Sequence, residues 1–280
     1  MMKICVIGTG TMGSGIAQAF AQAGISVTMV GISEEELESG IKKISQNLSK
    51  LVEKGKIADS EMDVVLSRIE TSLNYIDCSD ADLVIEAVLE QMSLKKEIFS
   101  QLDTLCKPET ILASNTSSLS ITEIASYTRR QSRVIGMHFF NPAPVMKLVE
   151  VIKGQLTSPE VQEFVYNLAL KIDKTPINVN EAPGFVVNRI LVPLVNEAVG
   201  IYAEGVASAQ EIDQAMKLGA NHPMGPLALG DLIGLDVCLA IMEVLHKEFG
   251  EDKYRPHPLL RKMVRSGQLG RKSKQGFYKY

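Results

Sequence analysis

The chain has 280 residues, 45% of them hydrophobic and 22% charged, which is the balance of an ordinary globular protein with one large domain or two smaller ones. Its net charge of −4 offers no basic field to a nucleic acid. No apolar run approaches the roughly 18 residues needed to span a bilayer. These features exclude a nucleic-acid-binding protein and a membrane-spanning one.

The cysteines follow no metal-site or disulfide pattern. Cys5, Cys78, Cys106 and Cys238 are scattered without a C-x-x-C pair, which favours reduced structural thiols in a cytosolic protein. The first apolar run starts at Lys3, so we expect no cleavable signal. The expected location is the cytoplasm, and no metal site is predicted.

A strand, a glycine-rich turn and a helix are predicted at the start of the chain. The apolar run 3–7 is followed by G-x-G-x-x-G over residues 8–13 and then by a helical segment. The glycines permit a tight turn, close approach of a pyrophosphate and close packing of helix on strand. The helix N-terminus offers N–H groups to the phosphates. In this context the motif predicts a dinucleotide site, with contacts from Gly8, Gly10, Thr11, Met12 and Gly13.

The second predicted strand, residues 26–30, ends without the expected acid. NAD-binding folds usually carry Asp or Glu about 20 residues beyond the glycines, where it binds the ribose 2′-OH. This chain has Gly31, then Ile32 and Ser33. Gly31 is either a permissive turn residue or a residue that leaves room for a 2′-phosphate, with Ser33 as a donor. We predict a preference for NADP over NAD, and we expect Gly31→Asp to favour NADH. The glutamates at 34–36 count against this preference.

A long amphipathic helix is predicted after Ser33. Ser33 and Glu36 have the spacing of a capping box. Apolar residues then recur at 37, 41, 44, 48 and 51, and the other face holds lysines at 42, 43, 50 and 54. These lysines are either a solvated face or a binding surface for an anionic ligand.

Strands and helices alternate as far as residue 152. Strands are predicted at 81–88, 110–115, 134–138 and 147–152, and helices at 93–105 and from 121. This alternation predicts an α/β, Rossmann-type, doubly wound and mostly parallel sheet. From Pro183-Gly184 onward, the segments 186–203, 208–217 and 232–249 have helical spacing and no strand is evident. We therefore expect a dinucleotide-binding domain, 1–183, and an all-helical substrate and dimerisation domain, 184–280.

A few polar residues are placed where a ligand would lie. His138 ends an apolar strand, and ligands of open α/β sheets bind beyond the carboxyl ends of strands, so it is a general acid/base candidate. Glu150 lies in the next apolar run and needs a partner. The two either pair or are a structural histidine and a surface glutamate. Asn115 and Ser117 follow a strand end and fit a turn or a site. Asn188 is a helix–helix hydrogen bonder or an active-site amide.

Taken together, these residues resemble the L-3-hydroxyacyl-CoA dehydrogenase family in its short bacterial form, from Lys3 to Tyr280. The segments around His138 and Asn188 are far more specific than the glycine motif. The matching segments are 8–13, 82–87, 113–118, 136–144, 181–189, 222–226 and 270–273.

The resemblance implies an NAD(P)H-dependent, reversible reduction of a short 3-oxoacyl-CoA, acetoacetyl-CoA, to the (S)-3-hydroxy thioester. It implies that His138 is the acid/base, that Glu150 orients it, and that Ser117 and Asn188 hold the substrate oxygen. It also implies a homodimer and a closure of the domains over the substrate. The implied cofactor contacts include Glu90, Lys95, Asn115, Ser117, Asn141 and Lys272, and Lys50 and Lys54 are suited to the CoA phosphates.

The chain departs from the family at two places. Gly31 replaces the usual acid, and residues 273–276 lack an additional glycine, which we interpret as surface variation. A non-catalytic dinucleotide-binding or sensor protein is an alternative, but it predicts loss of His138 or Glu150. A 3-hydroxyacid dehydrogenase is another, but such enzymes typically use a catalytic lysine and lack the segment 138–142. The acyl-CoA interpretation is favoured.

Overall fold

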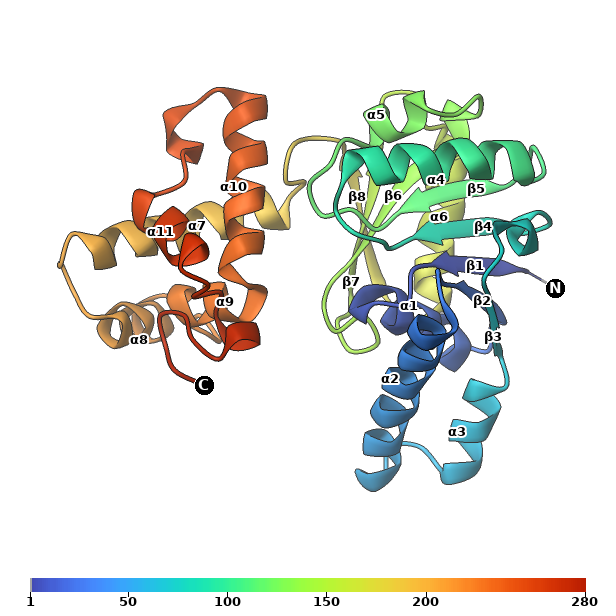
Figure 1. Ribbon diagram of the computed structural model, residues 1–280, viewed down its shortest axis with the longest axis horizontal. Helices are drawn as coiled ribbons and strands as arrows, with labels where there is room; N and C mark the ends of the chain where they lie inside the picture. The colour runs from blue at the N-terminus through green and yellow to red at the C-terminus, as the bar shows by residue number, and fades with distance from the viewer. Residues whose placement is uncertain (1) are drawn as a thin grey trace. The chain divides into compact units, whose positions relative to one another are not determined.

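The computed structural model describes residues 2–280, which fold as two compact units (Figure 1). The first unit ends at Glu181 and the second spans Ala182–Tyr280, so the division comes two residues before the expected boundary.

An eight-stranded sheet forms the centre of the first unit, in the order β3-β2-β1-β4-β5-β6-β7-β8. β1 to β6 are parallel, β7 is antiparallel to β6, and β8 is parallel to β7. The order 3-2-1-4-5-6 is that of a doubly wound dinucleotide fold, which confirms the predicted fold class. The strands are β1 Ile4–Ile7, β2 Val27–Val30, β3 Ile69–Ser72, β4 Leu83–Glu86, β5 Ile111–Ser114, β6 Val134–Phe139, β7 Leu148–Lys153 and β8 Thr175–Asn180.

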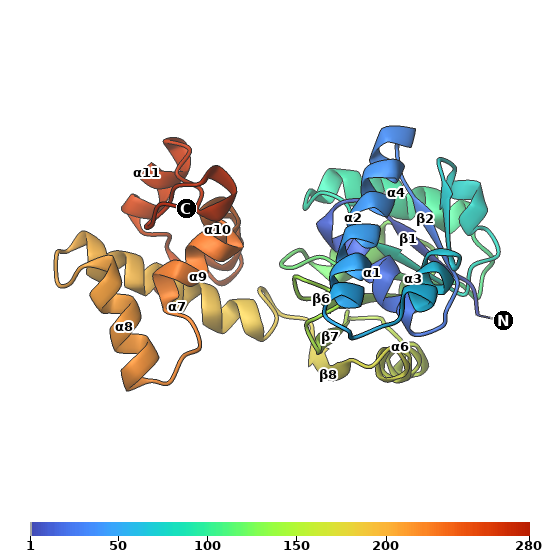
Figure 2. The ribbon, with the colours of Figure 1, turned by 90° about the horizontal axis from the view of Figure 1, so that it is seen from below.

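Helices cover both faces of this sheet, and Figure 2 shows α4 and α6 on opposite sides of it. The helices are α1 Thr11–Gln22, α2 Glu34–Glu53, α3 Asp59–Leu66, α4 Met92–Leu105, α5 Ile121–Ser126 and α6 Pro159–Lys171, with short 3-10 helices η1 Tyr75–Cys78 and η2 Gln131–Arg133. The sequence patterns did not reveal β3, β8, α3 or α6. Both strands lie at sheet edges, where β3 is largely polar and β8 contains Pro176, a residue that sheets tolerate at edges.

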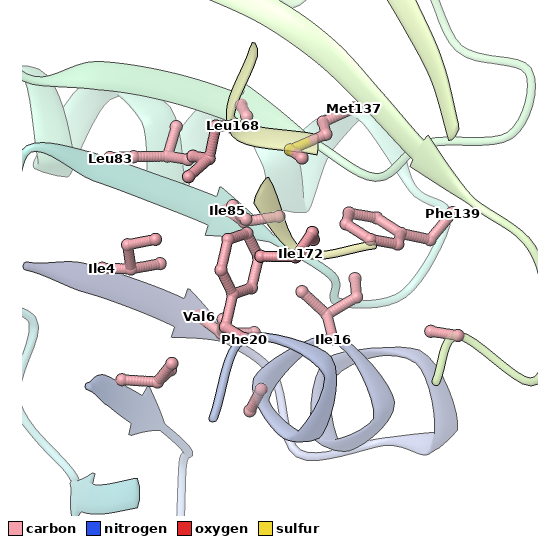
Figure 3. Close-up of a cluster of buried hydrophobic side chains, with 14 of the residues drawn as sticks. Ile4, Val6, Ile16, Phe20, Leu83, Ile85, Met137, Phe139, Leu168 and Ile172 are labelled. Carbon is pink, nitrogen blue, oxygen red and sulfur yellow. The ribbon is translucent and has the colours of Figure 1, made fainter. Parts of the chain in front are cut away.

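The core between the sheet and helices α1 and α6 fixes the start of the chain. Ile4 of β1 and Ile85 of β4 belong to one buried cluster with Phe20 of α1 (Figure 3). The rings of Phe20 and Phe139 meet edge to face, with centroids 6.4 Å apart. Each such buried side chain contributes about 1.5–3 kcal/mol, so the turn between β1 and α1 is held from both sides.

The second unit consists of helices and their connections. These are α7 Val187–Ala203, α8 Ala209–Gly219, α9 Pro226–Ile233, α10 Leu235–Phe249 and α11 Pro258–Arg265, with η3 Asp252–Tyr254 and η4 Arg271–Ser273. The prediction of one helix over 232–249 is wrong at its start. Gly234 takes a φ of +104° and separates α9, which ends at Ile233, from α10, which begins at Leu235. Lys274, within the segment that lacks the family's glycine, takes a φ of +60°. That conformation favours glycine, so surface variation is not the whole explanation there.

Within residues 2–280, no helix is both long and apolar enough to cross a membrane. The same residues form no group of three or more His, Cys, Asp or Glu side chains that could hold a metal ion. The cysteines are free thiols, and each is buried.

Candidate active site

The glycine turn between β1 and α1 has the shape of a phosphate site. Gly8 takes a φ of +108°, and a β-carbon there would lie 2.6 Å from the Ala87 carbonyl oxygen. A β-carbon at Gly13 would lie 2.0 Å from the Gly8 carbonyl oxygen, whereas one at Gly10 would meet nothing within 4 Å. Packing therefore requires Gly8 and Gly13, and Gly10 borders open space. Gly10 is also the N-cap of α1 and has no capping side chain, so the first-turn N–H groups of Thr11 and Met12 suit a pyrophosphate.

The end of β2 is closed by packing around Gly31. A β-carbon at Gly31 would lie 2.9 Å from Thr9 Cγ2 and 2.9 Å from Leu37 Cδ2. Ser33 caps α2, because its hydroxyl accepts a hydrogen bond from the Glu36 N–H at 3.3 Å. The Glu36 carboxylate accepts a bond from Thr9 Oγ1 at 3.3 Å. Only the Ser33 half of the predicted capping box is therefore formed, because the Glu36 carboxylate bonds to Thr9 of the glycine turn.

His138 and Glu150 lie directly opposite each other on the antiparallel strands β6 and β7. His138 Nδ1 and Glu150 Oε2 are 2.7 Å apart, and the two residues are 5% and 0% exposed. The pairing is therefore present, and the alternative of a surface glutamate is wrong. A carboxylate that accepts from Nδ1–H fixes the ring orientation and makes Nε2 the nitrogen that exchanges protons. The Phe140 ring lies 4.5 Å from the imidazole, centroid to centroid.

Ser117 and Glu90 are brought together after β5 and β4. Glu90 Oε1 accepts bonds from the Ser117 N–H at 2.8 Å, the Ser117 hydroxyl at 3.1 Å and the Thr116 hydroxyl at 2.5 Å. Burial alone raises the pKa of Glu90, but the charge of Lys95 and the bonds from Thr116 and Ser117 outweigh it and hold the pKa below its usual value. Glu90 is therefore an anionic acceptor that orients the Ser117 loop.

Lys95 is buried in an ion pair that the sequence analysis did not foresee. Its ammonium lies 2.7 and 2.9 Å from the two Glu86 carboxylate oxygens and 3.3 Å from Glu90 Oε2, and it is 1% exposed. Glu86 also accepts bonds from Ser114 Oγ at 2.6 Å and the Val88 N–H at 2.8 Å. A signal existed, because a glutamate inside an apolar strand needs a buried partner. A direct contact of Lys95 with a cofactor stays a prediction.

The segment around the carboxyl end of β6 is held by two further side chains. Asn115 Oδ1 accepts a bond from the Phe139 N–H at 2.8 Å, which ties the end of β5 to the residue after His138. Asn141, in the exposed loop that follows, lies just before a segment held by Lys174. The buried Lys174 ammonium donates to the carbonyl oxygens of Ala143 at 2.7 Å, Met146 at 2.9 Å and Pro144 at 3.3 Å. No sequence pattern marked Lys174.

Two of the remaining candidates lie on α2 or at its end, and two lie in the second unit. Lys50 and Lys54 are exposed on α2 and at its end, and neither makes an ion pair with any described residue. In the second unit, Asn188 lies in the first turn of α7 and is partly buried. Lys272 lies 2.5 Å from Asp236 Oδ1, at the start of α10. Their binding roles stay predictions.

Comparisons with known proteins cover the whole chain. The family described as "3-hydroxyacyl-CoA dehydrogenase, NAD binding domain" matches residues 3–182, and its "C-terminal domain" matches residues 184–280. A 3-hydroxybutyryl-CoA dehydrogenase of Clostridioides difficile is 61% identical over 100% of this chain and 99% of its own length. A probable 3-hydroxybutyryl-CoA dehydrogenase of Bacillus subtilis is 56% identical over 99% of this chain and 97% of its own. The crystal structure of (S)-3-hydroxybutyryl-CoA dehydrogenase from Ralstonia eutropha matches with a TM-score of 0.96 and 49% identity, over 100% of this chain and 99% of that one.

Proposed function

The chain belongs to the 3-hydroxyacyl-CoA dehydrogenase family and is an oxidoreductase, and from this premise we propose its reaction. The enzyme reversibly reduces acetoacetyl-CoA, a short 3-oxoacyl-CoA, to (S)-3-hydroxybutyryl-CoA with NAD(P)H. The observation that carries the proposal is the buried His138–Glu150 pair at the carboxyl end of β6, in the unit that also holds the glycine turn. The names of relatives 61% and 56% identical to this chain support the substrate.

His138 moves the proton in this mechanism. A bound nicotinamide dinucleotide supplies the hydride for reduction and accepts it in oxidation. As negative charge develops on the substrate oxygen, protonated His138 donates its proton, and in the reverse direction it takes the hydroxyl proton. Glu150 holds the ring and stabilises the imidazolium. Ser117, oriented by Glu90, and Asn188 are proposed to hold the substrate oxygen.

The residues of the glycine turn are proposed to hold the pyrophosphate, and the Ser117 cluster the nicotinamide end of the cofactor. Gly8, Gly10 and Gly13 give the backbone the shape and open space that a phosphate needs. Asn115 and Asn141 border the end of β6, and the paired side chains of Glu90 and Lys95 are proposed as further cofactor contacts. Lys272 is proposed as a further contact from the second unit.

NADP(H) is proposed as the preferred cofactor. Gly31 places no carboxylate at the end of β2, and the hydroxyl of Ser33 and the N–H groups of α2 can donate to a 2′-phosphate. Because Thr9 and Leu37 crowd the position of a β-carbon at 31, Gly31→Asp alone disturbs packing. Thr9→Ala removes one of these two contacts, and the other is with the end of the flexible Leu37 side chain. We therefore expect the double variant Thr9→Ala with Gly31→Asp to favour NADH when it is compared with Thr9→Ala alone. A wild-type kcat/KM that is higher for NADH would contradict the preference.

The family resemblance supports three proposals about the enzyme's setting: a homodimer, a cytoplasmic location and a role in butyrate and fatty acid metabolism. The second unit exposes large apolar side chains, with Val206 69% and Leu218 76% exposed, and such surface suits association. Light scattering on the purified protein tests the dimer, and cell fractionation tests the location.

The activity test follows oxidation of NADH or NADPH by absorbance, with acetoacetyl-CoA as substrate and chiral analysis of the product. We expect turnover and the (S)-thioester. No oxidation of either cofactor would indicate a non-catalytic dinucleotide-binding protein. Turnover of free acetoacetate in preference to its CoA thioester would indicate a 3-hydroxyacid dehydrogenase.

A further inference from the structure

A carboxylate lies beside the end of β2 although the strand itself ends in glycine. Thr9 contacts both groups concerned: its hydroxyl donates to Glu36 Oε2 at 3.3 Å, and its methyl group lies 2.9 Å from the place of a β-carbon on Gly31. Thr9 belongs to the glycine turn, and Glu36 to the first turn of α2, which packs beside α1 (Figure 1). The Glu36 carboxylate is therefore held at the corner where a dinucleotide fold normally places its acid.

The two neighbouring glutamates do not share this position. Glu34 and Glu35 belong to the same turn of α2 and, like Glu36, are exposed. A hydrogen bond with Ser33, the cap of the helix, lowers the pKa of Glu35. Within residues 2–280, the hydrogen bond from the glycine turn to this acidic run goes to Glu36. Position, and not acidity, therefore distinguishes Glu36 from its neighbours.

We propose that Glu36 is a specificity-determining residue, which sets how strongly the enzyme distinguishes NADPH from NADH. The inference rests on the proposed dinucleotide binding at the glycine turn. An anionic carboxylate at this corner accepts a hydrogen bond from a ribose 2′-OH and repels a 2′-phosphate. Gly31 and Glu36 therefore have opposite effects on the preference for NADPH over NADH. Gly31 favours NADPH because the strand ends without a carboxylate, and Glu36 weakens that preference because its carboxylate places negative charge at the same corner.

The experiment compares Glu36→Gln with Glu34→Gln as its matched control. Both variants remove one charge from the same helical turn, and glutamine is accepted at the position of Glu36 in a helix start. Calorimetry measures the binding of 2′,5′-ADP and 5′-ADP, two fragments that differ in the 2′-phosphate, so no turnover is needed. We expect Glu36→Gln to shift the affinity ratio about three- to tenfold toward 2′,5′-ADP, and Glu34→Gln to leave it near wild type.

Two further readouts separate charge from structure. The shift in Glu36→Gln should shrink as salt is raised, and the ratio of kcat/KM for NADPH and NADH should move in the same direction. Thr9→Val, which keeps the packing over Gly31 but cannot donate to Glu36, should shift the ratio less than Glu36→Gln, while Thr9→Ser keeps it.

The outcomes distinguish this inference from the proposed function. If both fragments bind and the ratio in Glu36→Gln equals that in Glu34→Gln, Glu36 is not a specificity-determining residue, and the proposed function stands. If neither fragment binds to wild type, dinucleotide binding is wrong and the inference falls with it.

Discussion

His138 owes its position to the register of two antiparallel strands. His138 and Glu150 are directly paired across β6 and β7, and a slip of one residue in either strand would move that strand's side chain to the other face of the sheet and break the pair. Glu150 is fully buried, so loss of the imidazole would leave a carboxylate without this partner. Orientation of the acid/base and stability of the strand pair therefore depend on the same contact.

The first prediction concerns this pair. We expect His138→Ala to lower kcat by a factor on the order of 10² to 10⁴ and to leave 5′-ADP binding largely intact, because the glycine turn is unchanged. Glu150→Gln keeps the volume but loses the charge that orients the ring, so we expect a smaller loss of kcat. Steady-state kinetics and fragment binding check both variants. Near-normal kcat in His138→Ala would refute its role as acid/base.

Lys174 is a buried cation held by the carbonyl oxygens of Ala143, Pro144 and Met146. It fixes the loop that connects the strand of His138 to the strand of Glu150. Burial, followed by the nearby charge of Lys147, lowers the pKa of Lys174. Keeping Lys174 protonated therefore lowers the stability of the folded protein, and this loss of stability becomes smaller as pH rises.

We expect Lys174→Met to lower the free energy of unfolding by about 2–4 kcal/mol, because three carbonyl oxygens lose their donor. Between the lowered folded pKa and the ordinary lysine value, the unfolded chain keeps a proton that the folded protein has released, so wild-type stability gains from rising pH. Methionine lacks this gain. The deficit of the variant should therefore widen from neutral to alkaline pH in urea unfolding, and a deficit that narrows would contradict the assignment.

At the scale of elements, helix α2 has two distinct parts. Its first turn carries Ser33 as the cap and Glu36 against the glycine turn. Its remainder buries Leu37, Ile44 and Leu48 and exposes lysines. The buried stripe secures the helix to the sheet layer, so the exposed cations are presented on a rigid support.

We expect Lys50→Ala and Lys54→Ala each to raise KM for acetoacetyl-CoA, more strongly at low salt, with kcat mostly unchanged. The reason is that exposed lysines attract the CoA phosphates through screened charge interactions. Lys171→Ala, at the exposed end of α6, is the control with the same change in net charge. If KM responds equally in all three variants, or in none, the lysine face of α2 is only solvated.

The sequence revealed those features that a local pattern encodes. Alternating strands and helices predicted the fold class. Two polar residues in apolar runs, His138 and Glu150, were marked as candidates, but their pairing was left open until the strand register placed them opposite each other. β8 was missed because Pro176 and polar residues mask an edge strand. The bond between Thr9 and Glu36 joins residues 27 apart, and Lys174 reaches a loop 28–31 residues before it. Contacts of this kind depend on how the elements pack against one another, and no rule of sequence spacing predicts them.

At the scale of the whole molecule, each unit has its own hydrophobic core. The stability of the second unit depends on the last residues of the chain. Asp231 of α9 is 1% exposed and accepts bonds from the Phe277 N–H at 3.0 Å, the Tyr278 N–H at 3.0 Å and the Tyr280 hydroxyl at 3.1 Å. The Tyr278 hydroxyl also donates to Asp213 Oδ2 at 2.8 Å. Burial raises the pKa of Asp231, although these donors oppose the shift. Two buried carboxylates thus hold the tail.

Truncation after Gly276 removes the tail donors of both carboxylates. We expect it to destabilise the second unit by about 3–5 kcal/mol, the cost of leaving a buried charge without partners. Tyr280→Phe removes one donor and should cost about 1–2 kcal/mol. Because the glycine turn belongs to the first unit, 5′-ADP should still bind to the truncated protein. Scanning calorimetry with fragment binding checks both expectations: an unchanged unfolding midpoint would show that the tail contributes nothing, and loss of 5′-ADP binding would show that the first unit does not fold independently of the second.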